Sequence, residues 1–198
     1  MNILRRIFGR AASSGPAGGD YAGGDYTEPR SGLVFPLELG GLRRHTAGRP
    51  YGEGDRGGES IPYGGNQAEA TVYVTQVARA EFPDGGDSDF IRGELESAMA
   101  AIQELERMGR YQSVKYFAGE PEKLGTHPGN LIWAKGAFLA MNDVRPMASF
   151  TYITALASKV IKLRISSVDP SNKALKEFPH ALGDLISRQR RTPESRGG

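Results

Sequence analysis

Lys162 and Arg164 are the two charged residues whose spacing most clearly could create a binding site. They alternate with Ile161, Leu163 and Ile165 in the run KVIKLRI. Because successive side chains of a β-strand point to opposite faces of the sheet, the two cations share one face and could bind an acidic partner or an anionic ligand. Simple solvation of the outer face of a sheet is the alternative interpretation.

The histidines and the absence of cysteine argue against several enzyme chemistries. The chain has no cysteine, which excludes disulfides, thiolate catalysis and cysteine-based metal sites. His45, His127 and His180 do not have the spacing of a metal-binding motif. We therefore expect no cofactor, no metal ion and a non-enzymatic protein. A catalytic site assembled from distant residues remains open, with His127 and either Lys135 or Glu120 as its candidates.

Two other motifs lack the flanking structure that their usual function requires. Gly52, Gly54 and Gly57 match the glycine pattern of a dinucleotide-binding turn, which needs a preceding strand and a following helix. Their neighbours are typical of a loop instead. The acidic segment 83–89 lacks the Gly and the distal Glu of a calcium-binding EF-hand loop. It is interpreted as a turn that caps a helix.

The positive charge of the chain is concentrated near its C-terminal end. Residues 159–198 carry nine basic and four acidic side chains. Such charge can attract nucleic acid, but cations also suit the C-terminal end of a helix, where they interact favourably with its dipole. We adopt the second interpretation and expect no nucleic-acid partner. The basic residues at this end are Arg188, Arg190, Arg191 and Arg196.

The N-terminal segment 1–10 is not typical of a signal peptide. Arg5 and Arg6 follow only Ile3 and Leu4, whereas a signal peptide needs about 7–15 apolar residues after its basic start. The segment could form a short amphipathic helix that contacts a membrane surface weakly, or it could be a frayed terminus. These features predict a cytoplasmic protein, with peripheral membrane contact as an alternative.

Glycine-rich composition divides the chain into a tail, a domain and a second tail. The repeat AGGDYAGGDY cannot bury apolar surface, so residues 1–32 are expected to be a disordered segment and linker. A single domain is predicted over 33–190, followed by a disordered tail over 191–198. Inside the domain, 43–66 has the composition of an exposed loop that leads into a short strand near Ser60–Tyr63.

Hydrophobic periodicity predicts strands and one long helix. ATVYVTQV (70–77) alternates and indicates a half-buried strand. A helix is predicted over 89–108, capped by Asp87 or Ser88 and ended by Gly109. Its apolar stripe follows helical spacing. The stripe consists of Ile91, Leu95, Ala98, Ile102 and Leu105.

The second half of the chain contains three further predicted strand regions and a final helix. A short strand is expected at 111–119 and a loop at 120–130. A buried strand follows at 131–142, and strands at 148–156 and 159–167 form an antiparallel hairpin. DPSN then caps a last helix, in which Pro179 predicts a kink or a restart because it removes a hydrogen bond. The last helix has its apolar stripe at Leu175, Phe178, Leu182 and Leu185.

These elements predict an α+β fold, an antiparallel sheet flanked by a long central helix and a C-terminal helix. The order of these elements resembles that of the PsbP-like α/β sandwich, which is named for an extrinsic subunit of photosystem II. The matching residues are Ala70–Val74, Phe150–Thr154 and Lys159–Ile165. The resemblance covers roughly 33–190 and includes small bacterial proteins of that fold. It implies an accessory role without a shared catalytic set. The tip Leu156-Ala157-Ser158 lacks the usual Gly, which predicts a longer or bulged turn.

The sequence therefore favours a non-enzymatic binding or assembly module with a protein partner. Lys162, Arg164, Tyr152 and Lys135 are the predicted binding residues. An enzyme with a polar pocket for an anionic small molecule, and weak membrane association through residues 1–10, are the alternative hypotheses.

Overall fold

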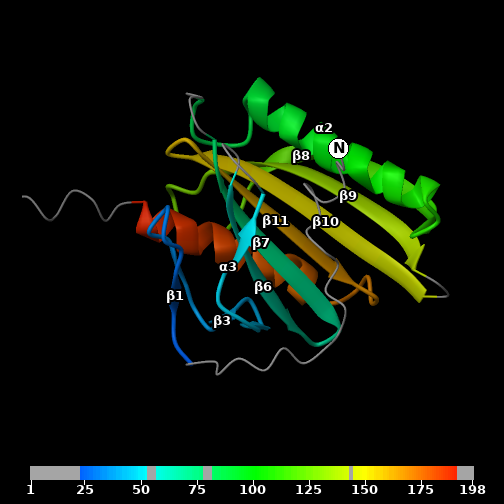
Figure 1. The fold of residues 1–198 in the computed structure, drawn as a ribbon, viewed down its shortest axis with the longest axis horizontal. Helices are drawn as coiled ribbons and strands as arrows, with labels where there is room; N and C mark the ends of the chain where they lie inside the picture. The colour runs from blue at the N-terminus through cyan, green and yellow to red at the C-terminus, as the bar shows by residue number, and fades with distance from the viewer. Residues whose placement is uncertain (1–22, 53–56, 78–81, 143–144, 191–198) are drawn as a thin grey trace, which may run out of the picture.

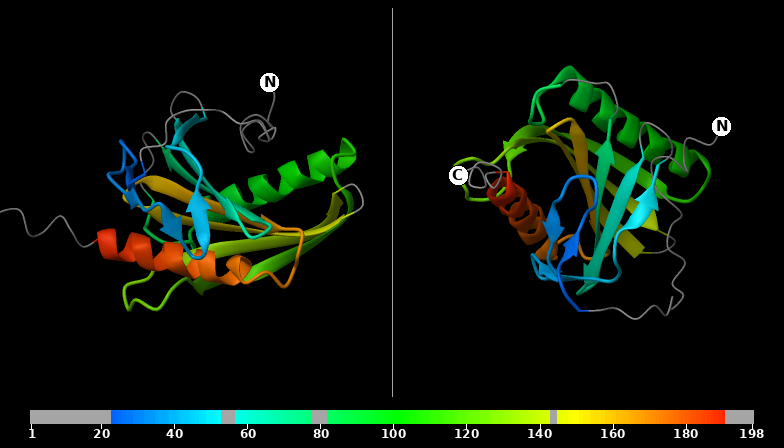
Figure 2. Two further views of the ribbon diagram at one scale, coloured as in Figure 1. Left: turned by 90° about the horizontal axis from the view of Figure 1, so that it is seen from below. Right: turned by 60° about the vertical axis from the view of Figure 1, so that its left-hand side comes forward.

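A large, curved antiparallel sheet carries one helix on each of its faces (Figure 1, Figure 2). The α+β class predicted from the sequence is therefore confirmed. The segments 1–10, a possible membrane-contacting helix, and 191–198, an expected tail, lie outside the residues that the structure describes. The computed structural model describes residues 23–52, 57–77, 82–142 and 145–190.

Within the described residues the main sheet has nine strands, eight of which follow one another side by side. The ninth, β5 (Arg49–Tyr51), pairs with β6 (Gly58–Gly65) outside this order. A separate pair is formed by β1 (Tyr26–Thr27) and β2 (Val34–Phe35). The main path runs, in spatial order, through β3 (Glu38–Leu39), β4 (Leu42–Arg44), β6 (Gly58–Gly65), β7 (Ala68–Gln76), β11 (Lys159–Ser167), β10 (Arg145–Leu156), β9 (Ile132–Asn142) and β8 (Gln112–Lys123).

The helix α2 (Asp89–Arg107) packs on β8, β9 and β10. It begins as the sequence predicted, because the Ser88 hydroxyl accepts a hydrogen bond from the Ile91 N–H at 3.3 Å. It ends before Gly109, whose φ of 72° suits a residue without a side chain. Ile91, Ala98 and Ile102 are buried against the sheet, so the predicted stripe is the packing face.

The helix α3 (Ala174–Gln189) covers the opposite face and completes the larger core. It runs as one helix through Pro179, so the predicted restart is wrong. The proline lies in the second turn, where it leaves only the Leu175 carbonyl without its usual N–H partner. Phe178 and Leu182 are fully buried on either side of it, and their packing holds both parts of α3 against the same surface.

The β10–β11 hairpin lies in the middle of the sheet and has a tight tip. Leu156 pairs with Lys159, so only Ala157 and Ser158 form the turn, and the longer or bulged tip expected from the sequence is wrong. Both residues have positive φ, 48° and 60°, as a two-residue type I′ turn requires. The Ala157 N–H donates to Asp84 Oδ1 at 2.8 Å, which supports this unfavourable conformation.

Regular structure also begins earlier than Leu33. The Glu28 side chain is fully buried, and its carboxylate accepts hydrogen bonds from the Arg30 and Ser31 N–H groups at 3.0 and 2.7 Å. This turn joins β1 to β2 and fixes a segment that the sequence assigned to the linker.

Two predicted loops are partly strands. The segment 43–66 contains β5 and all of β6, because pairing between β5 and β6 and between β6 and β7 stabilises residues whose local composition favours a loop. The loop predicted at 120–130 begins later, since β8 continues to Lys123 beside β9. The register shift between Gly119 and Glu122 accommodates Pro121 in this strand.

Candidate functional site

The sheet separates the four predicted binding residues into two sites on opposite faces. Lys162 pairs with Tyr73 and with Ile153 on the face that carries α2. Tyr152 pairs with Lys135 on the face that carries α3. Paired residues of neighbouring antiparallel strands share a face. Lys162 and Arg164 therefore form one site, and Lys135 and Tyr152 form another.

The first site, here the Lys162 cluster, consists of Lys162, Arg164, Tyr51, Tyr73 and Tyr111. The Lys162 Nζ donates to the Tyr51 hydroxyl at 3.2 Å. It lies 4.6 Å from the centroid of the Tyr73 ring and 5.3 Å from that of Tyr51, within the range of cation–π attraction. Arg164 Nη2 donates to the Tyr111 hydroxyl at 2.9 Å. Both cations are thus held by aromatic side chains rather than extended into solvent.

The surroundings of Lys162 disfavour its charged form. Burial lowers the pKa of Lys162 to about 8, the Glu94 carboxylate on α2 acts in the opposite direction, and the Arg164 guanidinium lowers the pKa further. A lysine titrates near 10.4 in water. A perturbed titratable group beside a specific charge partner is a common feature of functional sites.

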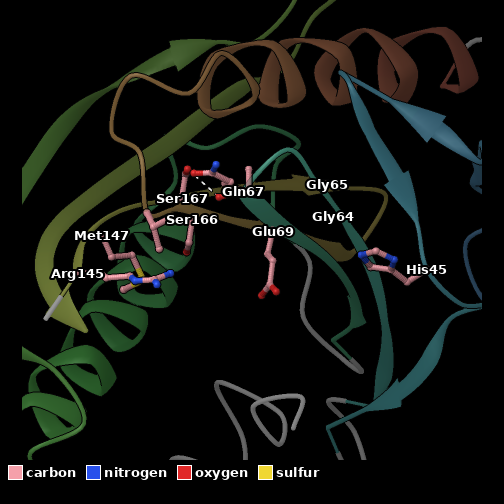
Figure 3. Close-up of a pocket in the computed structure, with 11 residues that line it drawn as sticks. His45, Gly64, Gly65, Gln67, Glu69, Arg145, Met147, Ser166 and Ser167 are labelled. Atoms are coloured by element: carbon pink, nitrogen blue, oxygen red, sulfur yellow. Dashed lines mark hydrogen bonds between the residues drawn. The ribbon is translucent and has the colours of Figure 1, made fainter. Parts of the chain in front are cut away.

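An open hollow of about 770 Å³ lies on the same side of the sheet (Figure 3). Arg145 and Glu69 extend into it from β10 and β7, and the His45 ring borders it on the side away from Arg145. Ser166 of β11 forms part of its wall and follows Lys162 and Arg164 on one face of that strand. We call this space the Arg145 hollow. Its lining residues are His45, Gly64, Gly65, Gln67, Ala68, Glu69, Arg145, Met147, Ser166, Ser167 and Val168.

The second site, here the Lys135 groove, is apolar and lies where α3 does not reach. Phe117 and Leu139 are 47% and 41% exposed, which is high for large apolar side chains. The groove has a volume of about 300 Å³. It is lined by Phe117, Ala118, Gly119, Lys135, Ala137, Phe138, Leu139 and Phe150.

Lys135 and Tyr152 form the polar margin of this groove. Lys135 Nζ forms an ion pair with Glu122 Oε1 at 3.0 Å and lies 5.6 Å from the Tyr152 ring centroid. Burial and the charge of Glu122 raise the pKa of Tyr152 above its usual range, so its hydroxyl is neutral at physiological pH. The margin therefore offers a partly neutralised cation and a flat aromatic surface.

His127, the histidine candidate for catalysis, and His180 both have structural hydrogen bonds. The His180 Nδ1 accepts from the Gly125 N–H at 2.8 Å, and the His127 Nδ1 accepts from the Gly129 N–H at 3.1 Å. The loop that contains Gly125 and His127 is tied to α3 by Asp184, whose Oδ1 accepts from the His127 N–H at 2.9 Å. Burial alone would raise the pKa of Asp184, but hydrogen bonds from this loop hold it below its usual value.

Among the described residues, no hydrogen bond joins His127 to Lys135 or to Glu120, its two candidate catalytic partners. Lys135 forms an ion pair with Glu122, and the Nδ1 of His127 accepts the Gly129 N–H within its own loop. In the part of the chain that the structure describes, no three His, Asp or Glu side chains are grouped as metal ligands would be.

Sequence reasoning missed the partners of Lys162. Tyr73 alternates with Val72 and Val74 in the predicted strand ATVYV, and the structure pairs it with Lys162 on the same face of the sheet. Tyr51 gave no such signal because it is 111 residues from Lys162 and lies in a segment with the composition of a loop. Arg145 was also missed, because β10 begins at Arg145 whereas the sequence predicted this strand only from residue 148.

Comparison with known proteins does not assign a family: no protein-family model matches the chain, and no curated protein matches its sequence. Among the described residues, neither helix combines the length and the apolar character needed to cross a bilayer. Function is therefore inferred from the geometry of these sites.

Proposed function

We propose that the protein is a non-enzymatic binding module that docks an extended segment of a partner protein along β8 and the Lys135 groove. The observation that carries the proposal is the exposure of Phe117 and Leu139 beside a strand at the edge of the sheet. Exposed apolar side chains grouped in this way commonly mark interaction sites.

The edge position of β8 favours an extended occupant over a helix. Within the described sheet β8 pairs only with β9, so one side of its main chain has N–H and C=O groups that an added strand can bind. Its register with β9 is regular over Lys115–Gly119 and shifts on both sides. Such irregularities protect an edge from indiscriminate pairing, and they restrict docking to this short stretch.

The groove supplies side-chain specificity next to the main-chain contacts. Alternate residues of an added strand point to the same face, and the α3-side face here presents Phe117, Leu139 and Phe150. An apolar side chain of the partner can fill this space, while Lys135 and Glu122 lie at its margin and can bind polar groups. A partner segment with alternating apolar residues is therefore the best match.

The fold resemblance is compatible with this role. We propose that the antiparallel sheet with a helix on each face belongs to the PsbP-like α/β sandwich type, whose members generally act as binding or assembly factors. Support comes from the order of the strands and helices. The resemblance contributes no catalytic residue, in keeping with a docking role.

The test compares Phe117→Asp and Leu139→Asp with the control Val168→Asp in purification from the native host. Val168 is also exposed, at 37%, but lies outside the groove. A carboxylate in the groove would have to be desolvated by an apolar partner, so both groove variants should lose a protein that wild type and the control retain. An identical set of proteins with all four would overturn the proposal.

Self-association through the same edge is distinguished by sedimentation of the purified chain. A second copy pairing through β8 would give a concentration-dependent dimer that Phe117→Asp abolishes. In that case the occupant of the Lys135 groove would be a second copy of this chain rather than a different protein.

A further inference from the structure

Independently of the docking edge, we propose that the Arg145 hollow binds a small acid that also carries an amino or hydroxyl group. The acidic group would pair with Arg145, and the hydrogen-bond donor would bind Glu69. The residues concerned come from β7, β10 and the β6–β7 turn, on the face opposite the Lys135 groove.

The two charges face the same space without neutralising each other. Arg145 and Glu69 both extend into the hollow (Figure 3), and neither forms an ion pair with another described residue. A guanidinium binds a carboxylate or phosphate through parallel hydrogen bonds, and a carboxylate accepts from ammonium or hydroxyl groups. A ligand that carries both functions can satisfy both side chains at once.

The wall of the hollow depends on a glycine. A side chain at Gly64 would collide with His45 Nε2, so glycine lets the imidazole lie directly against β6. The ring then borders the space without filling it (Figure 3). The volume of about 770 Å³ lies within the range of small-molecule sites.

The rim is held in place before any ligand arrives. Asn66 and Gln67 form the two-residue turn between β6 and β7, with positive φ values of 50° and 63°. The Ser167 hydroxyl donates to the Gln67 carbonyl at 2.9 Å and accepts from the Asp169 N–H at 3.0 Å. The φ values of Asn66 and Gln67 are those of a two-residue type I′ turn, which fixes the position of the rim. A preformed rim also reduces the entropy lost on binding.

Neighbouring charge favours a ligand with net negative charge. Lys162, Arg164 and Ser166 alternate along one face of β11, with about 7 Å between successive members because each strand residue advances about 3.3 Å. Together with the Glu94 carboxylate that acts on Lys162, the two cations leave a net positive charge on the side of the sheet that carries the hollow, whose only described carboxylate is Glu69. An amino or hydroxy diacid fits this balance better than a simple zwitterion.

The test uses L-glutamate and glutarate as probes, since they differ only in the amino group. Nuclear magnetic resonance of the full-length protein should show saturable shifts at the backbone amides of Gly65, Gln67 and Ser167. Arg145→Gln should weaken glutamate binding by ~10-fold or more, because it removes a charge-assisted hydrogen bond. Arg188→Gln, on α3 and exposed, is the matched control and should leave binding unchanged.

Glu69→Gln provides the specificity test. Wild type should prefer glutamate to glutarate, and the variant should lose that preference, because the amide no longer attracts the ammonium group and no longer repels the second acid. Equal effects of Arg145→Gln and Arg188→Gln, or unchanged discrimination in Glu69→Gln, would overturn the proposal. Shifts that do not saturate, or that lie away from the hollow, would also overturn it.

Discussion

Replacing Lys162 by methionine should stabilise the protein at neutral pH. Methionine keeps an unbranched apolar side chain of similar reach but needs no solvation of an ammonium group. The amine of Lys162 lies among Tyr51, Tyr73 and Arg164, where its charged form is disfavoured. The wild-type protein therefore uses folding free energy to hold this charge in place.

The magnitude follows from the pKa and the aromatic contacts. A pKa of about 8 instead of the usual 10.4 or so corresponds to roughly 3 kcal/mol, since one pKa unit is about 1.4 kcal/mol. Cation–π attraction to two rings opposes this by about 1–2 kcal/mol. Lys162→Met should then raise the free energy of unfolding by about 1–2 kcal/mol at pH 7.

The sign of the pH dependence distinguishes this cause from better packing. Between pH 8 and about 10 the unfolded chain holds a proton on Lys162 that the folded protein has released, so wild-type stability should rise with pH in this window. The variant lacks this rise. The advantage of Lys162→Met should therefore shrink by about 2 kcal/mol between pH 7 and pH 9.5.

Urea unfolding at several pH values measures both quantities, with Lys176→Met as the control because Lys176 is exposed on α3. Tyrosines such as Tyr152, whose pKa is raised in the folded protein, lower the free energy of unfolding only at higher pH. This contribution is shared by the two variants, so it cancels when their free energies of unfolding are subtracted. The reasoning would be refuted if Lys162→Met were less stable than wild type at pH 7. It would also be refuted if the difference in free energy of unfolding between Lys162→Met and wild type did not change with pH.

Three further changes test the packing of the fold. Ser158→Gly should stabilise by about 1 kcal/mol in urea unfolding, because its positive φ suits glycine; a loss of stability would contradict the turn geometry. Gly183→Ala should destabilise by about 2 kcal/mol or more, because the new methyl group collides with the Leu124 carbonyl, and a neutral effect would contradict this close approach. Asp184→Ala should speed amide exchange in the loop 125–130 by ~10-fold or more, whereas unchanged exchange would show that α3 does not hold the loop.

The elements that the sequence predicted are those determined by local patterns. The apolar stripe of α2, its Ser88 cap and Gly109 are all contained within about twenty consecutive residues. Alternation likewise placed Lys162 and Arg164 opposite Ile161, as the structure confirms. In both cases the period of the side chains alone decides which face is buried.

The composition of the sites could not be predicted because it depends on register between strands. Tyr152 and Ile153 are both apolar or aromatic, so alternation in β10 does not show which face each occupies. The face follows from the two-residue tip, which pairs Tyr152 with Leu163, and the sequence suggested a longer tip. Contacts such as Lys162 with Tyr51 depend on pairings formed by distant segments.

Photo-crosslinking in the native host tests the docking proposal most directly. A photoreactive phenylalanine analogue at position 117 would lie in the Lys135 groove, and the same analogue at position 168 would also be exposed but outside the groove. The docking proposal predicts a defined covalent adduct with one partner protein from position 117 and none from position 168. No adduct from position 117, or the same adduct from both positions, would contradict it.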